Sequence, residues 1–247
     1  RLRDCPYRFF ALRQLGLRRH DELDAEVDKA DWGSWVHAVL DLVHKALQAA
    51  PDADRPALME AAAGQATEKI FQGALDPGEF MPFAAAWPAL RDTYLLWLAQ
   101  HEAGGHVFQA AEEALEAQRG ELLRKGRIDR IDRGADGTPL LIDYKTERQE
   151  KSKARVKPGS EDTQLPFYAL LSGFEAPRAA YLNLADREPP SLHELGELQQ
   201  RAAELYEGMV HDLERIAAGV PLPALGEGSV CDWCEVRGLC RKDFWQA

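Results

Sequence analysis

The stretch that decides the fold spans residues 126–145 and reads GRIDRIDRGADGTPLLIDYK. Runs of isoleucine, leucine and charged residues flank Asp136-Gly137, a dipeptide typical of the tight turn in a β-hairpin. We therefore expect antiparallel strands over 122–133 and 140–144. Because side chains alternate across a strand, Asp143 and Lys145 should point to one face and Tyr144 to the other.

The same hairpin can place Asp129 beside Asp143. Two neighbouring carboxylates repel each other unless a positive group lies between them, and carboxylate oxygens suit Mg²⁺ or Mn²⁺. A bound cation would activate water, and Lys145 would stabilise charge that develops on a phosphate. Asp132 should face away from Asp129 and have a structural role. The alternative is an exposed hairpin whose charges are only solvated.

The residues around the hairpin predict an α/β fold with a mostly helical first part. Helical patterns cover 6–15, 57–71 and 90–103, and a further helix should begin after Ser34, which would cap it. A charged loop at 18–31 and a connector at 76–88 should lie between these helices. Residues 107–118 read as a strand, although their alanines and glutamates also suit a helix. After the hairpin we expect a basic loop at 148–159, a helix at 162–171 and a strand at 178–184. A long helix should then begin at Ser191, which forms a capping-box pattern with Glu194.

The length of 247 residues fits one domain. We expect a helical lobe at 34–105, a catalytic core at 106–190, and a long helix with a cysteine-rich tail at 191–247 that closes on Cys5. The chain has no long apolar run and no signal-peptide pattern, which predicts a cytoplasmic protein without membrane contact. It begins without methionine and is expected to be part of a longer chain.

The net charge of −11 argues against attraction of the whole surface to nucleic acid. Binding to DNA would instead depend on bound cations or on a local basic patch. One such patch follows the second hairpin strand and contains Arg148, Lys151, Lys153, Arg155 and Lys157.

The four cysteines lie at the two ends of the chain, as Cys5 and as Cys231-x2-Cys234-x5-Cys240. In a reducing compartment this uneven spacing favours a metal site over disulfides. A group held by all four would close nearly the whole chain into a loop, which is worth roughly 5 kcal/mol. The spacing suits zinc or a [4Fe–4S] cluster and does not separate the two.

Two further patterns place polar residues on helix faces. His37 lies on the second predicted helix, and Asp41 and His44 follow it at i+4 and i+7 on one flank of that helix. We assign no catalytic role to Asp41 or His44. Gln164 and Tyr168 are one helical turn apart and share a face.

Taken in order, the motifs resemble a known enzyme family. They are Gly33-x3-His37, Gly126-x2-Asp129, Ile142-Asp143-Tyr144-Lys145 and Gln164-x3-Tyr168, and together they resemble the RecB-like branch of the PD-(D/E)xK nuclease superfamily. Residues 5–10, CPYRFF, together with the three later cysteines, resemble the iron–sulfur version of this nuclease domain, which is found in AddB-type helicase–nuclease subunits. The CRISPR-associated adaptation nucleases share this four-cysteine plan.

The resemblance implies a restriction-endonuclease-like fold, in which helices flank a mixed β-sheet and a C-terminal iron–sulfur staple closes the chain. It implies that His37, Asp129, Asp143 and the backbone carbonyl of Tyr144 bind Mg²⁺ or Mn²⁺, and that Lys145 is catalytic. Gln164 and Tyr168 would orient the site or contact DNA. A [4Fe–4S] cluster would be held by Cys5, Cys231, Cys234 and Cys240.

The implied activity is metal-dependent hydrolysis of DNA, more as an exonuclease than as an endonuclease, on a single strand delivered to the site. The context would be a helicase–nuclease in DNA break repair or recombination. A G-x4-G-K-[ST] phosphate loop is absent, so a motor would lie elsewhere in the parent chain or in a partner subunit. The alternatives are a free-standing exonuclease of the CRISPR-adaptation type and a catalytically silent DNA-binding scaffold.

Overall fold

The computed structural model describes residues 2–18, 29–71, 77–185, 189–232 and 234–242. The chain divides into two compact units. One unit is Glu26–Glu207, and the other combines the end segments Arg1–Ala25 and Gly208–Ala247. Within the described residues, no helix has the length and apolar character that crossing a lipid bilayer requires.

The larger unit is built on a five-stranded mixed sheet in the order β1-β2-β3-β4-β5. Its strands are β1 Val107–Arg119, β2 Leu122–Arg133, β3 Pro139–Lys145, β4 Arg178–Asn183 and β5 Ser191–Glu194. The pair β3–β4 is parallel and the other neighbours are antiparallel. The expected hairpin is confirmed, and Gly137 adopts the left-handed φ of 82° that its turn needs.

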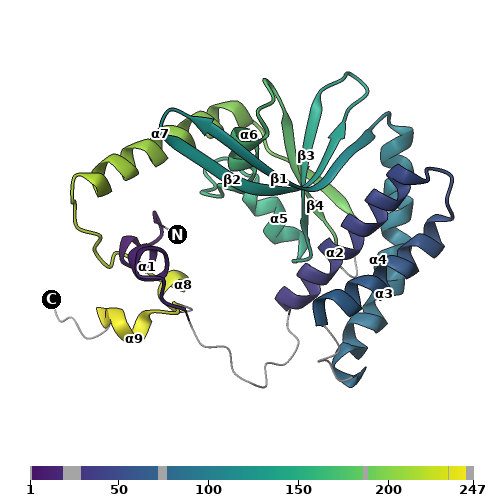
Figure 1. The fold of residues 1–247 in the computed structure, drawn as a ribbon, viewed down its shortest axis with the longest axis horizontal. Coiled ribbons are helices and arrows are strands. Elements are labelled where there is room, and N and C mark those ends of the chain that lie inside the picture. Colours follow the sequence, from purple (N-terminus) through teal and green to yellow (C-terminus); the bar gives the residue numbers. More distant parts are fainter. Residues whose placement is uncertain (1, 19–28, 72–76, 186–188, 233, 243–247) are drawn as a thin grey trace. The chain divides into compact units, whose positions relative to one another are not determined.

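Helices cover both faces of this sheet (Figure 1). The first face packs against α2 Lys29–Ala49, α3 Arg55–Phe71 and α4 Pro77–Ala103. The second face packs against α6 Gln164–Ser172 and the first turns of α7 Leu198–Ala217. Strand β3 contributes to both cores, because Leu140, Ile142 and Tyr144 face the first and Leu141 faces the second. This alternation confirms the expected separation of Tyr144 from Asp143.

The predicted connector at 76–88 is wrong for residues 77–88, because Pro77 already begins α4, and residue 76 lies outside the described part of the chain. This helix contains both Pro82 and Pro88, each of which costs about 3 kcal/mol inside a helix. Phe83 and Trp87 are buried between them against the rings of α2, with the Trp35 and Trp87 centroids 5.0 Å apart. Aromatic burial of about 1.5–3 kcal/mol per side chain offsets the prolines. Local propensity alone could not show this.

Ser34 does not cap α2, because the helix already includes Lys29. The hydroxyl of Ser34 instead donates to the carbonyl of Ala30, 2.9 Å away inside the helix. The predicted loop at 18–31 is therefore wrong for residues 29–31, and residues 19–28 lie outside the described part of the chain.

Ser191 does not open the last long helix either. Residues Ser191–Glu194 form β5, with Ser191 paired to Asn183 of β4, and α7 begins only at Leu198. Pairing of this segment with β4 overrides its capping-box pattern, since β4 would otherwise be an unpaired edge of the sheet.

The basic segment 148–159 contains a short helix, α5 Gln149–Arg155, where a loop was predicted. Arg155 fixes the end of α5 by ion pairs of 2.7 Å with both Glu147 and Asp162. Salt bridges to residues before and after the helix are not visible in its local sequence pattern, which explains the error.

A buried polar network lies between the sheet and the helices of its first face. The guanidinium of Arg130 donates to Asp132 at 2.7 Å, and Asp132 also contacts the ring of His101 at 2.7 Å. Arg130 further contacts His44 at 2.7 Å and the hydroxyl of Tyr94 at 3.1 Å. Burial favours the neutral acid, but Arg130 and His101 hold the pKa of Asp132 below its usual value. The network ties α2 and α4 to β2.

The smaller unit joins the two ends of the chain. It contains α1 Pro6–Phe9, the π-helical turn η1 Phe10–Gln14, α8 Ser229–Asp232 and α9 Arg237–Cys240. The backbone N–H of Tyr7 donates to the carbonyl of Pro223 at 3.1 Å, and Arg8 pairs with Glu235 at 2.7 Å. The first predicted helix therefore exists, but its second half has π-helical geometry.

Replacement of Asp132 by asparagine should destabilise the protein by about 3–5 kcal/mol, because Arg130 would remain buried without a counter-charge. Urea unfolding followed by circular dichroism measures the change. The matched control is Asp92→Asn, which removes an ion pair whose carboxylate is 63% exposed and should cost less than about 1 kcal/mol. Equal effects of the two substitutions would contradict the structural role of the network.

Candidate active site

Asp129 and Asp143 lie side by side on adjacent strands. The register pairs Arg130 of β2 with Ile142 of β3, and because the strands are antiparallel, the next step along brings Asp129 opposite Asp143. The hydroxyl of Tyr168 lies 3.1 Å from Oδ1 of Asp129 and 3.0 Å from Oδ1 of Asp143. Asp129 also accepts the backbone N–H of Tyr144 at 2.9 Å. The sequence-predicted pair of carboxylates therefore meets in one place.

Lys145 and Gln164 complete the side of the site that α6 covers. The ammonium of Lys145 lies 2.7 Å from Oδ2 of Asp143 and donates to Oε1 of Gln164 at 2.8 Å. The amide nitrogen of Gln164 donates in turn to Oδ1 of Asp143. Gln164 is the first residue of α6, and its backbone N–H is held by Asp162 at 3.1 Å. The α6 pair predicted to share a face thus points at the carboxylates.

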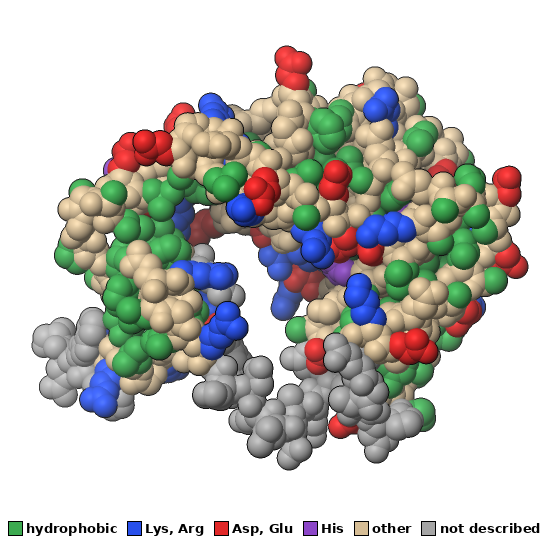
Figure 2. Space-filling model, in the orientation of Figure 1, with side chains coloured by type: hydrophobic (Ala, Val, Ile, Leu, Met, Phe, Trp, Pro, Cys, Tyr) green, Lys and Arg blue, Asp and Glu red, His purple; other side chains and the backbone are tan. Residues whose placement is uncertain are grey.

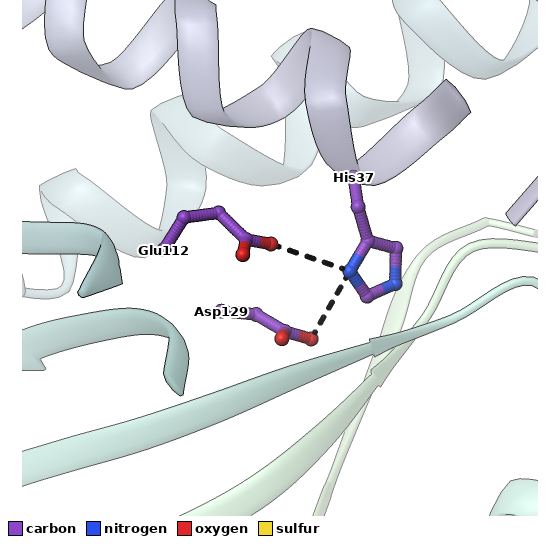
Figure 3. A group of neighbouring side chains, drawn as sticks. All are labelled: His37, Glu112 and Asp129. Carbon is purple, nitrogen blue, oxygen red and sulfur yellow. Dashed lines mark ion pairs between the residues drawn. The ribbon is translucent and has the colours of Figure 1, made fainter. Parts of the chain in front are cut away.

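His37 of α2 reaches the site from the opposite side of the sheet. Its Nε2 lies 3.1 Å from the carbonyl oxygen of Tyr144, and its Nδ1 lies 3.4 Å from Oδ2 of Asp129. The same Nδ1 lies 3.6 Å from Oε1 of Glu112 (Figure 3). All three of these side chains offer ligand atoms within 4.8 Å of one another, a spacing at which a metal ion could be held.

Glu112 was missed by sequence reasoning. It lies on β1, between the pairs Ala111–Arg130 and Glu113–Ile128, and so opposite Asp129. Its backbone φ of 49° is in the left-handed region, where a residue with a side chain is strained. Segment 107–118 contains several glutamates, and only the β1–β2 register distinguishes Glu112 from the others.

Two glycines in the motifs have packing roles. A Cβ on Gly126 would lie 2.8 Å from Leu171 Cδ2 and 3.2 Å from Phe167 Cε1, so glycine lets α6 approach β2. That approach brings Tyr168 to Asp129. A Cβ on Gly33 would lie 3.3 Å from Thr146 Oγ1, so this glycine lets α2 pass close to the end of β3. One helical turn after Gly33, the ring of His37 contacts the backbone carbonyl of Tyr144.

Burial and mutual repulsion disfavour ionisation of the two aspartates. Burial, with the negative field of Asp143, raises the pKa of Asp129 to about 7. Burial also raises the pKa of Asp143, against the opposing effect of Lys145. For His37, burial lowers the pKa, but contact with Glu112 and the fields of Asp129 and Asp143 outweigh it and raise the pKa overall. The site therefore attracts positive charge.

Basic side chains lie beside this acidic site. Figure 2 shows Lys and Arg side chains interleaved with carboxylates around a histidine where α2 passes the sheet. Arg127 is 62% exposed, and its guanidinium lies 3.6 Å from Glu112. In the predicted basic patch, Arg155 is engaged in ion pairs, whereas Arg148, Lys151, Lys153 and Lys157 are exposed.

Residues without a predicted catalytic role lie elsewhere. Asp132 belongs to the buried network with Arg130, as its expected direction on β2 implied. His44 joins the same network, and burial, reinforced by Arg130, lowers its pKa well below the ordinary value. Asp41 pairs with Lys45 at 2.6 Å on α2.

In the smaller unit, all four cysteines are free thiols and line one cavity. The cavity has an empty volume of about 370 Å³, part of which is open to solvent. A Cβ on Gly226 would lie 3.2 Å from Cys5 Cβ and 3.3 Å from Cys231 Sγ, so glycine keeps this space open. Thiols from both ends of the chain thus converge.

Comparison with known proteins identifies the family of the chain. A family model described as the PD-(D/E)XK nuclease superfamily matches residues 1–241. No curated protein matches the chain. A solved structure titled "Crystal structure of SSO0001" matches with 14% identity and a TM-score of 0.32, over 95% of this chain and 94% of that one, a likeness too low to support an argument. The family match covers nearly the whole chain, and the protein therefore belongs to the PD-(D/E)XK nuclease superfamily, a membership that implies metal-dependent nuclease activity.

Proposed function

We propose that the chain is the deoxyribonuclease domain of a RecB/AddB-like helicase–nuclease, which hydrolyses single-stranded DNA as an exonuclease during break repair or recombination. The observation that carries the proposal is the meeting of Asp129, Asp143 and Lys145 at one point, with Gln164 and Tyr168 bonded to them. The chemistry belongs to the unit Glu26–Glu207. A helicase motor would be supplied by the parent chain or by a partner subunit.

The residues present fit a hard divalent cation. Asp129 and Asp143 are buried, and burial together with their mutual repulsion raises the pKa of Asp129 to about 7, so an added positive charge would stabilise their ionised forms. His37, Asp129 and Asp143 would hold Mg²⁺ or Mn²⁺, since the carboxylate oxygens of the two aspartates suit these ions. When bound, the cation would polarise the phosphate and lower the pKa of a water.

The protein's own groups orient and stabilise the reacting atoms. Lys145 holds a positive charge 2.7 Å from Asp143, where it can stabilise charge developing on a phosphate oxygen. Gln164 bonds both Lys145 and Asp143 and so fixes the ammonium relative to the carboxylate. Tyr168 contacts both aspartates and keeps them in register. Arg127 and the exposed lysines of the basic patch are available to phosphates of the bound strand.

We further propose that the four cysteines hold a [4Fe–4S] cluster. The four thiols line one cavity, and a cluster bound there would join α1 to the C-terminal segment of its own unit. Thiolates suit both zinc and iron–sulfur clusters, and the resemblance of the cysteine motif to the iron–sulfur version of the nuclease domain favours the cluster. Four free thiols also support a reducing, cytoplasmic compartment.

The chain should cleave labelled single-stranded DNA in the presence of Mn²⁺ or Mg²⁺. Asp143→Asn and Lys145→Ala should each reduce the rate by about 10²–10³-fold or more, since each removes a charge at the reacting phosphate. The exposed Asp92→Asn serves as the control. Strands labelled at the 5′ or the 3′ end distinguish exonuclease from endonuclease products. Cleavage that survives both active-site changes would refute the mechanism, and binding without cleavage would indicate a silent scaffold.

The metal-free protein should lose stability as the pH rises. The pKa of Asp129 is about 7 in the folded protein and 3.8 ordinarily, so its stabilising effect is complete below about pH 4 and is lost as the pH passes 7. Thermal unfolding in EDTA should show this fall, and Mn²⁺ at pH 8 should raise Tm by about 5 °C or more. Asp129→Asn should reduce both effects, and an unchanged pH profile in this variant would exclude Asp129 as the cause.

Anaerobic purification should yield a brown protein with about four iron atoms per chain. Cys234→Ser should lose iron and colour and should unfold at lower temperature, because the cross-link between the chain ends is lost. Elemental analysis and visible absorbance provide the measurements. A colourless protein that contains stoichiometric zinc would overturn the cluster assignment.

A further inference from the structure

We propose that Glu112 is a protein ligand of the divalent cation, and that His37 binds this cation through Nδ1 while its Nε2 carries the proton. The inference deepens the proposed nuclease site and rests on it. It departs from the ligand set that the sequence motifs imply, in which Glu112 has no part and the Tyr144 carbonyl binds the metal directly.

The hydrogen bond of His37 to Tyr144 determines which ring nitrogen is available. Nε2 lies 3.1 Å from the Tyr144 carbonyl oxygen, and a carbonyl can only accept a hydrogen bond. Nε2 must therefore carry a proton. In a neutral imidazole this leaves the lone pair on Nδ1, and ligating histidines commonly donate their other ring N–H to a carbonyl in this way.

The surroundings of Nδ1 provide the other ligands. Carboxylate oxygens of Asp129 and Glu112 lie 3.4 and 3.6 Å from it, and both side chains point to this one nitrogen (Figure 3). Neighbouring ligands of an octahedral ion with bonds of about 2.1 Å lie about 3 Å apart. A contraction of a few tenths of an ångström would bring these atoms to that spacing. Asp129 and Glu112 are 10% and 18% exposed in their side chains, so solvent compensates little of their charge.

The backbone of Glu112 adopts a strained conformation that directs its side chain into the site. Its left-handed φ of 49° directs one glutamate of β1 into the site, whereas its neighbour Glu113 is exposed. Besides His37, Arg127 pairs with Glu112, but the 3.6 Å separation and the 62% exposure of Arg127 make this pair weak. A cation between Glu112, Asp129 and His37 would supply the missing charge.

Titration of the metal-free chain with Mn²⁺, followed by electron paramagnetic resonance, tests the role of Glu112 without relying on activity. Glu112→Gln should weaken Mn²⁺ binding at least tenfold, whereas the matched neighbour Glu113→Gln should leave it unchanged. Glu112→Gly suits the left-handed backbone, so this variant should remain folded and should also bind weakly. Thermal unfolding without metal verifies that the variants are folded.

The outcomes separate this inference from the proposed function. Unchanged Mn²⁺ binding in Glu112→Gln, with binding lost in Asp129→Asn, would overturn the role of Glu112 and leave the nuclease site intact. Absence of Mn²⁺ binding in the unaltered chain would overturn both. Imidazole ¹⁵N spectra with Mg²⁺ bound should show the proton of His37 on Nε2, and a proton on Nδ1 would overturn the assignment of the ligating nitrogen.

Discussion

The repulsion between Asp129 and Asp143 is the constraint on which the rest of the site depends. Two carboxylates that share the Tyr168 hydroxyl and are largely shielded from water disfavour each other's ionisation. The positive charge of Lys145 compensates only one of them directly. The surrounding groups hold this pair of carboxylates together. The imidazole of His37 contacts Asp129, and the side-chain amide of Gln164 bridges Asp143 and Lys145.

The sheet and its two helical layers supply the rigidity that such an arrangement needs. His37 comes from the first layer, and Gln164 and Tyr168 come from the second, so the carboxylates are held from both faces of the sheet. Close approach on each side depends on a residue without a side chain, at Gly33 and Gly126. The geometry of the carboxylates at the centre therefore depends on close packing at these two glycines.

Much of this could be predicted from local patterns. The hairpin, the opposite directions of Asp143 and Tyr144, and the common face of Gln164 and Tyr168 follow from strand alternation and helical spacing, which tertiary contacts did not override. The prolines of α4 and the strand at Ser191 were misjudged because distant partners, Trp35 and Asn183, decide those segments. Glu112 escaped notice for a similar reason, since its place depends on how β1 pairs with β2.

Strand β2 carries out two tasks with consecutive residues. Asp129 serves the acidic site, whereas Arg130 enters the buried network with Asp132 on the opposite face. An insertion or deletion of one residue in this strand would exchange the two directions, placing a guanidinium among the carboxylates and a carboxylate among the aromatic rings. This segment therefore has almost no freedom to change length, and variation among relatives should be confined to the turns at its two ends.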